Sequence, residues 1–95
     1  MTHQLKALPK FEKQFKKFFP KDQGVIRAEL KKIQADPSVG ERKKGVLTHV
    51  WVHKFKVHRQ LYLLAYEPVE KERVVYLYAI ATHENFYEAL QRYIR

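Results

Sequence analysis

The sequence predicts an α+β fold with the element order β-α-α-β-β-β-α, in which two N-terminal helices pack on one face of an antiparallel sheet. Three observations support this prediction. Apolar residues recur at helical spacing before residue 36, runs of β-branched and aromatic residues follow residue 45, and 95 residues suffice for one hydrophobic core. We therefore expect a single domain over residues 1–95, with a short helix at its C-terminal end.

A short strand and an amphipathic helix are predicted first. Residues 2–8 favour a strand, and Pro9 suits the first turn of a helix. Apolar residues then recur at spacings of three and four, which places them on one side of a helix that Pro20 ends. The members of this stripe are Leu8, Phe11, Phe15 and Phe18.

A second helix is predicted to begin with Asp22 as its N-cap and to end before Asp36. The proline at position 37 favours that end, because the residue before a proline is disfavoured in the helical conformation. The buried face of this helix is expected to consist of Ile26, Leu30 and Ile33. Residues 36–45 contain proline, glycine and basic residues and predict a loop.

The second half of the chain is predicted to form three strands, over residues 46–57, 61–67 and 73–82. Their connections are short enough for hairpins, so the strands should form an antiparallel meander. A last helix is expected to follow, with Thr82 or His83 as its cap. Its buried face would consist of Phe86, Leu90, Tyr93 and Ile94.

Basic residues are concentrated in the first two thirds of the chain. The net charge is +9, and 15 of the 19 basic residues but only 5 of the 10 acidic ones precede residue 61. A field of one sign favours a polyanionic partner, most often nucleic acid. A charged face that only keeps the protein in solution is the alternative.

Several classes of site and of protein are excluded by composition. The absence of cysteine excludes a thiol nucleophile and any Cys-based metal site. His49 and His53 would lie about 13 Å apart on a strand, too far to chelate one ion, so we expect neither a metal nor a cofactor. No stretch approaches the roughly 18 apolar residues of a membrane span, and a cytoplasmic protein is expected.

Two lysines of the first long strand are candidate phosphate contacts. In a strand Lys54 and Lys56 point to one face and lie about 7 Å apart, close to the spacing of adjacent phosphates. His53 points to the other face. A solvated surface explains the two lysines equally well.

His83 is a candidate acid or base, because it lies at a predicted strand-to-helix junction one turn before Tyr87. A neutral imidazole beside a phenol and several lysines can cleave RNA without a metal. The base takes the 2′-hydroxyl proton, cations stabilise the charge on phosphorus, and an acid protonates the leaving oxygen. On spacing alone, a helix cap at His83 and a core position for Tyr87 are favoured.

Three segments resemble the RelE/ParE superfamily of bacterial toxin–antitoxin toxins: residues 50–57 (VWVHKFKV), 62–66 (YLLAY) and 81–87 (ATHENFY). The last is similar to the C-terminal signature of the YafQ-type ribonucleases. The resemblance implies a RelE-like fold and a ribosome-dependent mRNA endonuclease. It also implies an antitoxin that inhibits the enzyme, and an active site on the exposed face of the sheet.

The resemblance also implies roles for individual residues. Lys54 and Lys56 match the paired strand lysines of RelE, which contact substrate phosphate and assist proton transfer. His83 matches a position that is Arg in RelE and His in YafQ-like members, and Tyr87 resembles the tyrosine of the last helix. RelE has an arginine where this chain has a leucine in the strand 61–67, and Arg59 is expected to supply that cation.

Three functions are therefore considered. The first is an mRNA interferase, a hydrolase that inhibits translation by general acid–base chemistry, with a cognate antitoxin, the ribosome and mRNA as partners and no membrane. Its catalytic residues would be His83, Tyr87, Lys54, Lys56 and Arg59, and its contacts to RNA and the ribosome would be Lys10, Lys13, Lys16, Lys17, Lys43, Lys44 and His53. The alternatives are a ParE-like DNA gyrase inhibitor without nuclease activity and a non-catalytic basic RNA-binding module.

Overall fold

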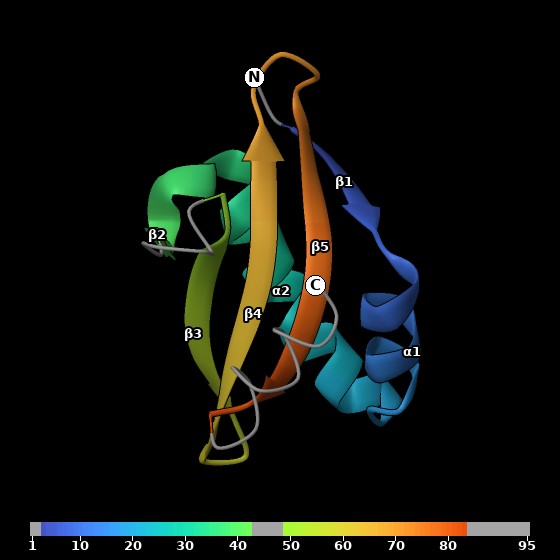
Figure 1. Ribbon diagram of the computed structural model, residues 1–95. Helices are drawn as coiled ribbons and strands as arrows, with labels where there is room; N and C mark the ends of the chain where they lie inside the picture. The colour runs from blue at the N-terminus through green and yellow to red at the C-terminus, as the bar shows by residue number, and fades with distance from the viewer. Residues whose placement is uncertain (1–2, 43–48, 84–95) are drawn as a thin grey trace.

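Within the described residues, 3–42 and 49–83 of a computed structural model, two helices and five strands form an α+β fold, as predicted (Figure 1). The sheet has the strand order β1-β5-β4-β3-β2. The elements are β1 (Gln4–Ala7), α1 (Pro9–Lys16), α2 (Pro20–Ala35), the 3-10 helix η1 (Pro37–Val39), β2 (Glu41–Arg42), β3 (Trp51–Val57), β4 (Gln60–Val69) and β5 (Val74–Thr82). The predicted last helix, Lys43, Lys44 and Tyr87 lie outside the described residues.

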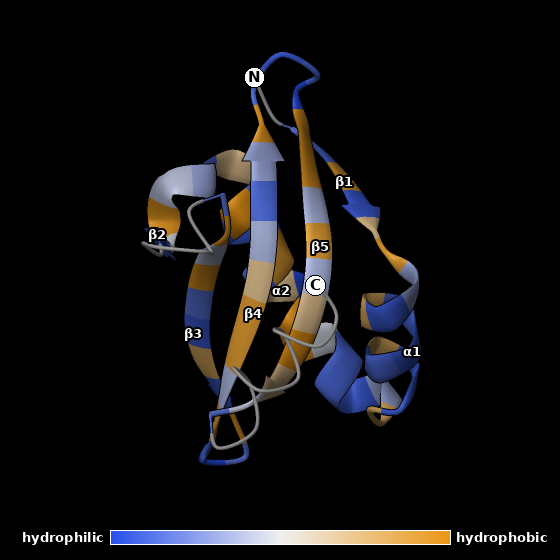
Figure 2. Ribbon diagram, in the orientation of Figure 1, coloured by the Kyte–Doolittle hydropathy of each residue, from blue (hydrophilic) through white to orange (hydrophobic). Residues whose placement is uncertain are grey.

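Both helices cover one face of the sheet, as predicted, and the main core lies between the two layers (Figure 1). The helices contribute Phe11, Ile26 and Ile33, and the strands contribute Phe55, Val57, Leu64, Tyr66, Val75, Leu77 and Ile80. Figure 2 shows hydrophilic and hydrophobic residues alternating along the C-terminal half of β3, where the exposed Lys54 and Lys56 alternate with the buried Phe55 and Val57. We call the sheet face turned away from α1 and α2 the opposite face.

The predicted meander is confirmed, since β4 pairs antiparallel with both β3 and β5. The two-residue turn His58–Arg59 connects β3 to β4, and both of its residues have positive φ, 51° and 67°. Such values are typical of a type I′ hairpin turn. The sheet is not wholly antiparallel, because β1 pairs with β5 in parallel.

Strand β4 is longer than predicted and runs through Pro68, which the sequence had suggested as part of a connection. The pairing with β3 ends at Tyr66, so beyond that point β4 bonds only to β5 among the described residues. Proline is tolerated where one edge of a strand makes no ladder hydrogen bond. Opposite Ala65 and Tyr66, the register shifts by one residue at Tyr78, and this bulge lets Leu77 and Ile80 both face the helices.

The start of α2 differs from the prediction. Pro20 occupies the first helical position and Phe19 is the N-cap, without a side-chain cap. Proline suits this position because its missing N–H leaves no hydrogen bond unmade. Asp22 therefore lies within the first turn, where its buried carboxylate faces the positive end of the helix dipole. The side-chain amide of Gln23 donates hydrogen bonds to carbonyl oxygens at the end of the preceding helix and so fixes the corner between α1 and α2.

The predicted loop after α2 contains both η1 and β2. The hydroxyl of Tyr66 donates a hydrogen bond to the Pro37 carbonyl at 2.6 Å and accepts one from the Gly40 amide at 3.0 Å. Tyr66 is fully buried, and its burial raises the pKa of the phenol above the usual 10.0. The single hydroxyl thus anchors the segment that enters β2.

Replacement of Gly40 by alanine is expected to lower the free energy of unfolding by about 1–3 kcal/mol. A Cβ at this position would lie 2.5 Å from the Tyr66 hydroxyl oxygen and 2.8 Å from the Val52 carbonyl oxygen, and the backbone carbonyl cannot yield easily. Gly24→Ala is the control, because nothing lies within 4 Å of its Cβ position inside α2. Urea unfolding should show the control gaining about 0.4–1 kcal/mol. Equal stability of the two variants would contradict this account.

Candidate functional site

Lys54 and Lys56 lie in β3, and both side chains are exposed. Their partners in β4 are Leu63 and Leu61. Leu63 belongs to a small apolar cluster on the opposite face, together with Val50, Val52, Ala65 and Ala79. Because residues directly across a ladder share a face, Lys54 projects from the opposite face beside this cluster, and Lys56 projects from the same face two pairs further along.

His83 is exposed and directly follows β5. Its backbone N–H donates to the carbonyl of Leu61 at 3.2 Å, which extends the ladder between β4 and β5 by one residue. Since Leu61 also pairs with Lys56, the three residues form one row across three strands. Two strand spacings, about 10 Å, separate the backbones of Lys56 and His83, and their side chains are long enough to meet on one bound phosphate.

Arg59 belongs to the turn at the same end of the sheet as this row (Figure 1). It is exposed and follows Lys56 by three residues. The structure therefore brings four of the predicted residues to one end of the sheet, although they come from β3, from the β3–β4 turn and from the residue that follows β5. We call Lys54, Lys56, Arg59 and His83 the basic row.

The chemistry of the basic row suits a phosphodiester. Two ammonium groups and a guanidinium can hold a phosphate and stabilise added negative charge on it. An imidazole at His83 can act as a general acid or base. Among the described residues no three potential ligands gather as a metal site, and no helix is both long and apolar enough to cross a membrane.

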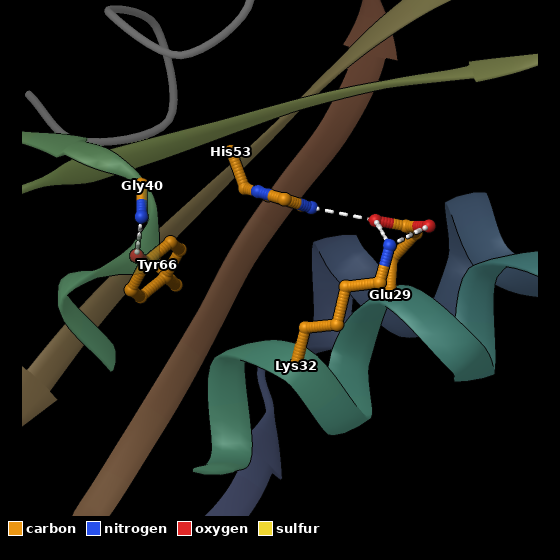
Figure 3. A network of polar contacts seen from close by, with 5 residues as sticks. All are labelled: Glu29, Lys32, Gly40, His53 and Tyr66. Atoms are coloured by element: carbon orange, nitrogen blue, oxygen red, sulfur yellow. Dashed lines mark hydrogen bonds and ion pairs between the residues drawn. The ribbon is translucent and has the colours of Figure 1, made fainter. Parts of the chain in front are cut away.

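His53 differs from the other predicted contacts to RNA, because it faces the helices. It is 9% exposed, its ring packs against Phe55, and its Nε2 donates to Glu29 at 2.7 Å (Figure 3). The same carboxylate accepts hydrogen bonds from Lys32 at 3.0 and 3.3 Å. These contacts tie the middle of β3 to α2, and we therefore omit His53 from the proposed contacts to RNA.

Glu29 should make stability depend on pH. Burial acts to raise the pKa of its carboxyl, but hydrogen bonds from His53 and Lys32 outweigh burial, and the pKa lies below the usual 4.5. The unfolded chain then binds the proton more tightly, so Glu29 stabilises the fold above the usual pKa and loses this effect as the pH falls through the lower one. Glu29→Gln should lower the free energy of unfolding at pH 7, and that free energy should then fall less steeply as the pH is lowered. Urea unfolding between pH 7 and 3 measures this, with Glu12→Gln in the exposed first turn of α1 as control. An acid slope as steep as that of the wild type would contradict the assignment.

A second group of predicted contacts lies on α1, in the helix layer. Lys13 and Lys16 occupy the last turn and Lys17 follows as the C-cap, and all three are exposed. Cations there also stabilise the helix, because its C-terminal end carries partial negative charge. Lys10 is half-buried and interacts with another group of the molecule. These lysines are separated from the basic row by the thickness of the sheet.

One contact at this end of the molecule has no counterpart in the predicted site. His58, the other residue of the turn, donates from Nε2 to Asp22 at 2.7 Å. The two residues are 36 positions apart, and neither shows a signal in the sequence that points to the other.

Residues 5–91 match the model of a protein family described as ParE-like toxin of type II bacterial toxin–antitoxin systems. No curated protein matches the chain. Among solved structures, a free mutant of the E. coli toxin RelE has a TM-score of 0.74 at 15% identity, over 98% of this chain and 94% of that one. The RelBE2 toxin–antitoxin complex of Mycobacterium tuberculosis has a TM-score of 0.74 at 13% identity, over 87% of this chain and 100% of that one. The intact E. coli RelBE toxin–antitoxin complex has a TM-score of 0.68 at 16% identity, over 83% of this chain and 94% of that one. At these identities the solved structures show a shared fold.

Proposed function

This chain belongs to the ParE-like toxin family of type II bacterial toxin–antitoxin systems, within the RelE/ParE superfamily, and on that premise we propose that it is an endoribonuclease that cleaves mRNA on the ribosome. The observation that carries the proposal is the basic row. Lys56 and His83 are held on either side of Leu61 by the sheet register, with Lys54 two pairs along β3 and Arg59 in the turn at the same end of the sheet. A protein that only binds a partner by its surface has no need for an imidazole placed among phosphate-binding cations.

In the proposed reaction His83 moves the proton. As base it takes the proton of the 2′-hydroxyl, or as acid it protonates the leaving 5′-oxygen. Lys54, Lys56 and Arg59 hold the phosphate and stabilise the extra negative charge that develops on it. Tyr87 stays a prediction from the sequence for orienting the substrate or donating a proton. No step requires a metal or an organic cofactor.

The lysines of α1 are proposed to contact ribosomal RNA. They lie on a different layer from the basic row, so a substrate in the row would leave Lys13, Lys16 and Lys17 free to meet the ribosome. Contacts between lysine and phosphate add affinity without selecting a sequence. On this proposal the protein acts in the cytoplasm of its host. The helix layer binds the ribosome, and the opposite face of the sheet cleaves the mRNA.

A paired assay on the purified protein tests the proposal. Defined mRNA should be cut only when it is programmed into ribosomes, and DNA gyrase should go on supercoiling in the presence of the protein. The family model is named for ParE-like toxins, so inhibition of gyrase without cleavage would favour a ParE-like gyrase inhibitor that has no nuclease activity. RNA binding with neither effect would favour a non-catalytic module.

A cognate antitoxin is the proposed protein partner, as the two solved toxin–antitoxin complexes suggest. A disordered segment with acidic and apolar residues suits a toxin of net charge +9 that has exposed lysines and a strongly exposed Phe19. The complex should survive about 0.5 M salt, at which surface charge pairs are largely screened. Size-exclusion chromatography in that salt measures this. Complete dissociation would show an interface made of surface charges alone.

A further inference from the structure

We propose that Asp22 and His58 are positioning residues, whose hydrogen bond holds the β3–β4 turn against α2 and thereby places Lys56 and Arg59 for cleavage. This inference rests on the proposed function. Neither residue belongs to the basic row, and neither needs to touch substrate. The role assigned to them is to fix the turn from which part of the row projects.

The backbone of the turn is the first support. His58 and Arg59 both adopt the left-handed conformation, with φ of 51° and 67°. A type I′ turn favours Asn-Gly because residues with a larger side chain are strained in this region. Strained residues of this kind persist where the surroundings hold them, and they cluster at functional sites. Here the strained pair directly precedes β4 and includes a cation of the basic row.

The contact that holds the turn is the second support. His58 Nε2 donates to Asp22 Oδ1 at 2.7 Å, with 70% of the His58 side chain but only 10% of the Asp22 side chain exposed. Asp22 is itself fixed, because it lies in the first turn of α2, where Pro20 starts the helix and Gln23 binds the preceding segment. An exposed imidazole at the end of a hairpin is therefore bonded to a carboxylate that the start of α2 holds in place.

The other strand of the site is attached to the helix layer separately. The side-chain oxygen of Gln14 in α1 accepts a hydrogen bond at 2.8 Å from the Ile80 amide, three residues before His83. The end of β5 therefore keeps its own attachment when the turn is released. Loss of the contact between Asp22 and His58 should misplace Lys56 and Arg59 while His83 stays in place, and the loss of activity should be partial.

The opposite hairpin provides a matched control. The β4–β5 turn also contains a residue with positive φ, Arg73 at 54°, and Glu70 of that turn accepts a hydrogen bond from the buried His3 at 2.9 Å. This pair has the same chemistry at the end of the sheet away from the basic row. Glu70→Ala removes it without touching any group of the proposed site.

The test is single-turnover cleavage of ribosome-bound mRNA at saturating ribosome, with the ribosome concentration for half-maximal rate measured separately. His58→Asn keeps a residue that accepts the left-handed backbone, but its side chain is too short to reach Asp22. The rate should fall between about tenfold and 10²-fold, with half-saturation unchanged. Asp22→Ala should lower the rate by the same factor as His58→Asn. The double variant should be no slower than either single variant, because both substitutions remove the same contact. Glu70→Ala should cleave as the wild type does.

Circular dichroism and thermal melting establish the folded fraction of each variant, so that a rate per folded molecule is compared. Wild-type cleavage by folded His58→Asn, while the wild type itself cleaves, would overturn the positioning role and leave the proposed function standing. Equal losses in His58→Asn and Glu70→Ala would also overturn it, since a general effect on stability would then explain both. No cleavage by the wild-type protein would overturn the proposed function, and the positioning role with it.

Discussion

His83→Ala is expected to slow single-turnover cleavage of ribosome-bound mRNA by about 10²–10⁴-fold, the usual effect of removing one acid or base. The side chain is exposed, and its backbone is fixed by the hydrogen bond to Leu61, so the truncation should leave the strands in register. Binding to the ribosome should scarcely change, because it depends on many separate contacts between lysine and phosphate. Filter binding and single-turnover cleavage on one sample of the variant measure the two effects.

A role for His83 as a helix cap gives a different result. Loss of a cap costs about 1 kcal/mol of stability and leaves the rate per folded molecule unchanged. His49→Ala is the matched control, because His49 is also exposed but lies in the turn before β3 and outside the basic row. Thermal melting of both variants separates lost structure from lost chemistry. Cleavage at the wild-type rate by folded His83→Ala would remove the residue from the mechanism.

The fold was predictable because its signals are local. The stripe of Phe11 and Phe15 and the apolar face of Ile26 and Ile33 repeat at helical spacing, and all four lie in or against the main core. The start of α2 was misplaced because Asp22 and Pro20 both signal a helix start, and the rigid proline determined the first position. The parallel pairing of β1 with β5 has no local signal, since the partners are about seventy residues apart.

The candidate site was predictable only in part. Alternation along one strand places Lys54 and Lys56 on one face, and the structure agrees. Their proximity to His83 depends on the register of two hairpins, and spacing in the sequence does not determine that register. The family resemblance, not the spacing, selected this histidine. His53 and His58 show the limit most clearly, because both bind carboxylates of α2, across 24 and 36 residues. Contacts of that kind arise from the packing of layers.

The lysines of the two surfaces should have separable effects. Replacing Lys54 and Lys56 together by alanine is expected to slow the cleavage step by about 10²–10³-fold, because the charge that develops on phosphorus loses its stabilising cations. Replacing Lys16 and Lys17 by alanine removes the same charge from the exposed end of α1. That change should weaken association with the ribosome and lower the salt dependence of binding by roughly two counterions.

The contrast depends on where each pair of lysines lies. Lys54 and Lys56 project from the sheet beside Leu61 and Leu63, within reach of a substrate bound at His83, whereas the lysines of α1 lie on the other layer. The cleavage rate at saturating ribosome, set against the slope of log affinity with log salt, measures the two effects independently. If the strand variant lost affinity but cleaved at the full rate when saturated, β3 would contribute only to docking. His83 would then have to act without cations from that strand, and the basic row would no longer explain phosphoryl chemistry.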